Sequence, residues 1–159
     1  MGLLDWLFSK PSEEPERPRP GYAAHLRTAA GIGTSQIRCH RDTWAYFVEE
    51  FEKTTSHRDS HIFRPAAEKD ILHEANDMIM VSISGVSLAA LLDRCFDIQF
   101  RSWTPSWNYT MLDKAIAERV GKAITGALAR VVPATEVDGN ELVIVLDDRP
   151  VTQSTLRAE

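Results

Sequence analysis

Residues 57–61, His-Arg-Asp-Ser-His, are the one place in the sequence where side chains that bind metal ions cluster. In an extended segment His57, Asp59 and His61 would point the same way, because successive side chains alternate. In a helix His57 and His61 would share a face, four residues apart. Two imidazoles and a carboxylate suit zinc, manganese or non-haem iron. One hypothesis is therefore a metal-dependent enzyme built on this cluster.

The sequence around the cluster favours a simpler interpretation. The stretch TTSHRDSHIFRP is polar and predicts a loop, and short groupings of His and Asp arise often by chance. The chain carries neither HExxH nor GxSxG nor a phosphate-binding loop. Its two cysteines, Cys39 and Cys95, are far apart and neither belongs to a CxxC motif. We therefore expect no catalytic residue and no cofactor, with the metal-dependent enzyme kept as the alternative.

Two tryptophans, Trp103 and Trp107, flank Pro105 in a stretch that predicts a loop and is followed by Tyr109. Aromatic side chains on a loop can form a partner-binding surface, since Trp and Tyr are enriched in binding hot spots. They can equally close a small hydrophobic core. Trp103 and Trp107 are therefore candidates for contact with a partner.

The first residues of the chain carry the apolar feature that is hardest to assign to a core. Residues 2–9 predict a short amphipathic helix with Asp5 and Ser9 on its polar face. The opposite, apolar face holds Leu3, Leu4, Trp6, Leu7 and Phe8. A helix this short is marginal in water and needs a surface to lie against. It is the main candidate for binding a partner.

Residues 10–34 predict a disordered linker, because residues 10–20 hold four prolines among alternating charges. On such a tether the helix can dock into the groove of a protein partner, read through its i, i+3 and i+4 side chains. It can instead bind another copy of the chain, fold back on its own domain, or lie in a membrane interface. Few basic residues adjoin the helix, and this disfavours a membrane surface.

The mixture of helix and strand patterns along the chain predicts one α+β domain over residues 35–148. Residues 149–159 predict a disordered tail. We expect helices over 43–53, 66–76, 87–99 and 110–131, a strand over 78–84 and a hairpin near 134–147. The stripe Trp44, Phe47, Val48 and Phe51 has helical spacing and predicts a buried face. Residues 96–101 fit a strand or the end of a helix, and residues 142–146 predict a central strand.

Composition bounds the function further. The 159 residues carry a net charge of −5, and this argues against a nucleic-acid partner, which needs clustered Lys and Arg. No stretch is long enough for a membrane span or a secretory signal, which predicts a cytoplasmic protein. The sequence as a whole predicts a non-enzymatic adaptor or regulatory protein that docks through its N-terminal helix, with a peripheral membrane or self-associating protein as a further alternative.

Overall fold

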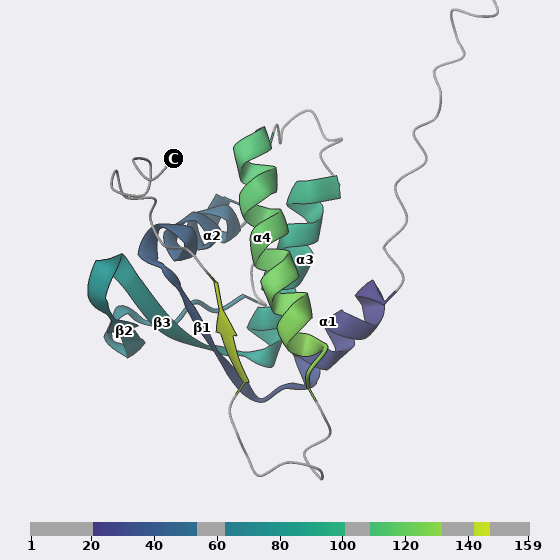
Figure 1. Cartoon of the computed structure of the whole chain (residues 1–159), viewed down its shortest axis with the longest axis horizontal. Coiled ribbons are helices and arrows are strands. Elements are labelled where there is room, and N and C mark those ends of the chain that lie inside the picture. Colours follow the sequence, from purple (N-terminus) through teal and green to yellow (C-terminus); the bar gives the residue numbers. More distant parts are fainter. Residues whose placement is uncertain (1–20, 54–62, 101–108, 132–141, 147–159) are drawn as a thin grey trace, which may run out of the picture.

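The computed structural model describes residues 21–53, 63–100, 109–131 and 142–146. Within these ranges the chain forms an α+β fold, with four α-helices against a four-stranded mixed sheet (Figure 1). In chain order the elements are α1 (Tyr22–Gly31), β1 (Thr34–His40), α2 (Arg41–Lys53), η3 (Glu68–Asp70), β2 (Ile71–His73), η4 (Ala75–Asp77), β3 (Met78–Ser84), α3 (Gly85–Phe100), α4 (Met111–Leu128) and β4 (Leu142–Val145).

The strands lie in the order β2-β3-β1-β4. β3 is antiparallel to both β1 and β2, while β4 is parallel to β1. Burial alternates along β1, where Ser35, Ile37 and Cys39 are buried between more exposed neighbours. Alternation of this kind places one face of the sheet in the core, because successive side chains of a strand point to opposite faces.

The helices supply the other half of the core. In α2, Trp44, Phe47 and Phe51 are buried and Val48 packs against them, as the helical spacing predicts. α3 and α4 run side by side (Figure 1) and bury mostly aliphatic side chains, which are Leu88, Leu91, Leu92, Cys95 and Ile98 in α3 and Val120, Ile124 and Leu128 in α4. The core is therefore continuous from the sheet through these three helices to Ala29 of α1.

α1 packs on α3 and α4 and is anchored by Ala29, which is fully buried. Its end meets the junction of β3 and α3 at Gly85. A Cβ atom on Gly85 would lie 1.9 Å from the carbonyl oxygen of Ile32 and 2.4 Å from that of Ala29. Only glycine fits this contact, so the backbones of the two segments touch directly.

Two sequence predictions are wrong in this region of the fold. Residues 22–34, predicted as part of a disordered linker, form α1 and the start of β1. Residues 66–76, predicted as a helix, form a 3-10 turn at Glu68–Asp70, then β2, and then the start of a second 3-10 turn at Ala75–Asp77. In both places tertiary contacts decide the structure, since α1 is held by α3 and β2 by its pairing with β3.

The predicted helices over 43–53, 87–99 and 110–131 and the predicted strand over 78–84 are confirmed. α2, α3 and α4 correspond to the predicted helices, β3 to the predicted strand, and the ambiguous residues 96–100 continue α3. β4 is a strand, but it lies at the edge of the described sheet and not at its centre. The rest of the predicted hairpin, residues 134–141, lies outside the described residues.

Candidate functional site

The candidates from sequence all lie outside the described residues. They are the N-terminal Leu3, Leu4, Trp6, Leu7 and Phe8, the metal candidates His57, Asp59 and His61, and the aromatic Trp103 and Trp107. Their roles stay predictions. Within the described ranges, no group of three or more His, Cys, Asp or Glu side chains is placed to hold a metal ion.

Two hollows on the described surface are lined in part by α1. The first, here called the α3 groove, encloses about 340 Å³ between α1, α3 and the end of α2. The second, here called the α4 pocket, encloses about 200 Å³ between α1, α3 and α4. α1 forms part of the wall of both hollows. The sequence did not predict this helix, so it did not predict either hollow.

The α3 groove is floored by one face of α3. Its floor residues recur at spacings of three and four, which places them in a row along the helix, and they are Val86, Ala89, Ala90, Asp93, Arg94 and Asp97. Leu26 and Ala30 of α1 form one wall, and Phe51 of α2 lies in the other. Val86 is 49% exposed, so apolar surface is open to solvent there. The result is an elongated, shallow and largely apolar channel.

The charged side chains of the α3 groove gather toward the C-terminal half of α3. The guanidinium carbon of Arg94 lies 5.3 Å from the ring centre of Phe51, within the range of a cation–π contact. The hydroxyl of Tyr22 donates a hydrogen bond to Asp93, which brings the start of α1 to this end of the groove. The groove is therefore apolar near Val86 and mixed in charge near the point where α1 begins.

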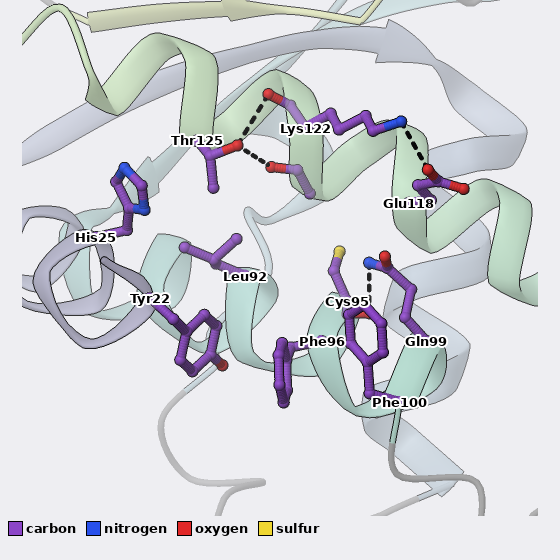
Figure 2. A pocket seen from close by; sticks show the side chains of 11 residues that line it. Tyr22, His25, Leu92, Cys95, Phe96, Gln99, Phe100, Glu118, Lys122 and Thr125 are labelled. Carbon is purple, nitrogen blue, oxygen red and sulfur yellow. Dashed lines mark hydrogen bonds and ion pairs between the residues drawn. The ribbon is translucent and has the colours of Figure 1, made fainter. Parts of the chain in front are cut away.

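The α4 pocket is shown in Figure 2. Tyr22 and His25 enter it from α1, and Phe96 and Phe100 line its α3 side. The three aromatic rings are tilted against one another, with ring centres of Tyr22 and Phe96 4.4 Å apart and those of Phe96 and Phe100 4.9 Å apart. Cys95 lies between α3 and α4 and is fully buried. Burial raises the pKa of the Cys95 thiol. A protonated thiol is a poor nucleophile, so Cys95 is a packing residue.

Three polar side chains around the α4 pocket, Lys122, Thr125 and Gln99, are paired within their own helices. Lys122 forms an ion pair with Glu118 at 2.6 Å, and the Thr125 hydroxyl donates to the carbonyl of Gly121 at 2.9 Å. The Gln99 amide donates to the carbonyl of Cys95 at 2.9 Å. These contacts are drawn as dashed lines in Figure 2. They orient the polar side chains along the helix surfaces, and they do not converge on one point where a reacting group would sit.

A buried carboxylate lies in the core, at Glu50 of α2, which is 5% exposed. Lys53 donates to its Oε1 at 3.1 Å, and the hydroxyl of Tyr109 donates to its Oε2 at 3.2 Å. Burial, followed by the charge of Glu50, raises the pKa of Tyr109 to about 12. The hydrogen bond and charge of Glu50 raise the pKa of Lys53. The cluster ties α2 to Tyr109, two residues before α4, which is a structural role.

The face of the sheet opposite the helices carries a third surface. Leu72, Val143 and Val145 are 63%, 42% and 55% exposed. Across the strands, Arg38 pairs in register with Val145, and its guanidinium lies 2.6 Å from the carboxylate of Glu74. This ion pair interrupts the apolar row, so the face is more mixed in character than the α3 groove.

Sequence reasoning missed the α3 groove for a definable reason. The apolar positions of α3 marked its buried face, and the opposite face holds small residues, Ala89 and Ala90, between charges. Small residues carry little hydrophobic signal, although they let another helix approach closely. The groove also needs α1 as a wall, and α1 was not predicted.

No protein-family model, curated protein or solved structure matches this chain. Among the helices of the described ranges, none is long and apolar enough to cross a bilayer.

Proposed function

We propose that this protein is a non-enzymatic, cytoplasmic adaptor or regulatory module that works by helix-in-groove recognition. Its N-terminal amphipathic helix docks on a protein partner, and its α3 groove has the form that receives a helix of the same kind. In this mode an apolar helix face lies in a hydrophobic groove and is read through side chains three and four residues apart.

The single observation that carries the proposal is the α3 groove. A face of α3 with two alanines and the half-exposed Val86 lies open between Leu26 of α1 and Phe51 of α2. Apolar surface rimmed by charged residues is typical of interaction sites. In the α4 pocket, Lys122, Gln99 and Thr125 are instead paired within their own helices, which supports binding over catalysis as the work of this domain.

Capture with the full-length protein tests the proposal. The wild type is compared with a Leu3→Asp, Leu7→Asp double variant, and Asp5→Asn on the polar side of the helix is the matched control. We expect a protein that the wild type and the control retain and the double variant loses. Purified, that protein should bind the wild type at least tenfold more tightly than the double variant. Equal binding by all three forms would contradict the proposal.

A further inference from the structure

We propose that the α3 groove is the resting place of the chain's own N-terminal segment, residues 2–9, and that a partner must displace the segment from it. The inference rests on the proposed function, since the same apolar side chains then serve both contacts. One amphipathic face cannot lie in two grooves at once. Partner binding and occupancy of the groove would therefore compete.

The dimensions of the groove fit this occupant. Its floor extends from Val86 to Asp97, 11 residue steps of α3. At about 1.5 Å per residue it is about 16 Å long, and an eight-residue helix is about 12 Å long. The alanine floor lets a helix carrying large side chains approach closely, while Leu26 and Phe51 supply apolar walls. Leu3, Leu4, Leu7 and Phe8 fall within one side of such a helix.

The tether begins at the correct place. Residue 22 starts α1, and the hydroxyl of Tyr22 contacts Asp93 in the floor of the groove. Twelve residues, 10–21, separate this point from the predicted helix, and an extended proline-rich chain spans about 3.1 Å per residue, or about 37 Å. The segment can therefore reach any part of its own groove. A short tether also gives an effective concentration in the millimolar range, which favours its own groove over that of a second copy.

Charges of the tether complement those of the groove. Arg17 and Arg19 precede α1 by a few residues and so lie close in sequence to the end of the groove that holds Asp93 and Asp97. Asp5, on the polar side of the segment, is opposite in charge to Arg27, which lines the α1 wall. The α4 pocket is about 200 Å³ and already filled along one side by the Tyr22, Phe96 and Phe100 rings, which leaves less room for Trp6.

Disulfide trapping in the full-length chain tests the assignment. Leu4→Cys is combined with Ala90→Cys in the α3 groove, with Thr125→Cys in the α4 pocket, or with Val143→Cys on the sheet. The native Cys39 and Cys95 are 1% and 0% exposed, so they do not compete in the folded protein. In a glutathione buffer we expect the Ala90 pair to form an intramolecular disulfide at least tenfold more readily than either control pair. Adding Leu3→Asp and Leu7→Asp should abolish the difference.

Each other outcome overturns the inference in an identifiable way. Equal trapping at the three positions means that the segment has no preferred place. Preference for Thr125 assigns it to the α4 pocket, and disulfide-linked dimers whose yield rises with protein concentration assign the groove to a second copy.

A groove variant separates this inference from the proposed function. Ala90→Glu should free the segment and strengthen binding of the purified partner several-fold, because a larger fraction of the protein is competent to bind. If trapping shows no preference while the Leu3→Asp, Leu7→Asp variant still loses the partner, the inference alone fails. If trapping succeeds and no partner distinguishes that variant, the proposed function alone fails.

Discussion

The hydroxyl of Tyr109 donates a hydrogen bond to the carboxylate of Glu50 at 3.2 Å, which joins two residues 59 positions apart. Glu50 is almost fully buried, and a buried carboxylate is costly unless donors surround it. Lys53 supplies a second donor from the same helix, whereas Tyr109 lies two residues before α4. The pair thus fastens α2 to α4 at one end of the helical layer.

This pair predicts a loss of stability at high pH. The folded pKa of Tyr109 is raised to about 12, above an unfolded value of about 10. A raised folded pKa stabilises the protein fully below pH about 10, and the contribution is lost as the pH rises from about 10 through 12. Tyr109→Phe should lower the free energy of unfolding by about 1 to 2 kcal/mol near neutral pH and should flatten its fall above pH 10. Urea unfolding over this pH range measures both effects, and an unchanged pH slope in the variant would contradict the assignment.

Gly85→Ala should destabilise the fold strongly. The added Cβ would meet two backbone carbonyl oxygens at 1.9 and 2.4 Å, so α1 or the β3–α3 junction must move, at a cost of at least about 3 kcal/mol. Gly126→Ala is the matched control, since nothing lies within 4 Å of its Cβ position. Alanine there should raise stability by about 0.5 to 1 kcal/mol through helix propensity. Thermal unfolding of both variants checks the pair, and similar midpoints would show that α1 does not press on Gly85.

Phe47→Ala should cost about 3 to 5 kcal/mol, because the ring is 2% exposed in the core and its removal leaves a cavity. Glu49→Ala, on the exposed face of the same helix, should change the free energy of unfolding by less than about 0.5 kcal/mol. Denaturant titration compares the two variants. Equal costs would refute the assigned faces of α2.

The metal hypothesis predicts that purified protein contains close to one equivalent of zinc, manganese or iron by elemental analysis. His57→Ala and His61→Ala should each remove it, since a site of three ligands does not survive the loss of one. Metal-free protein should also unfold at a higher temperature when the ion is restored. Preparations that hold no metal and gain no stability from any of the three ions would end this alternative.

The predicted N-terminal helix should bind protein in preference to lipid. Its five large apolar side chains are followed by Glu13, Glu14 and Glu16, which an anionic bilayer repels. Full-length protein should therefore stay at the bottom of a flotation gradient with both neutral and anionic liposomes. Co-flotation that the Leu3→Asp, Leu7→Asp variant loses would make this a peripheral membrane protein instead.

The elements that could be predicted are those whose periodic pattern coincides with burial. α2 shows its buried face through three aromatic side chains, and β3 shows its character through β-branched residues. α1 lacks such a pattern, since alanine supplies its fully buried position and a proline-rich segment precedes it. For β4 the pattern did not coincide with burial. Its apolar residues predicted a central strand, yet Val143 and Val145 are exposed. The α3 groove depends on which elements meet in space, and no local pattern encodes that.

The pairing of β4 with β1 determines when the sheet can be completed during synthesis of the chain. Leu146 donates its backbone N–H to the carbonyl of Arg38 at 2.9 Å, and Ile144, paired with Ile37, is 1% exposed. During synthesis β1 leaves the ribosome about a hundred residues before its parallel neighbour, and contacts that distant in sequence form late. Until then β1 keeps an open edge and the core lacks two aliphatic side chains. A nascent chain that stalls ahead of residue 142 therefore presents a strand edge of the kind that chaperones bind and aggregates recruit.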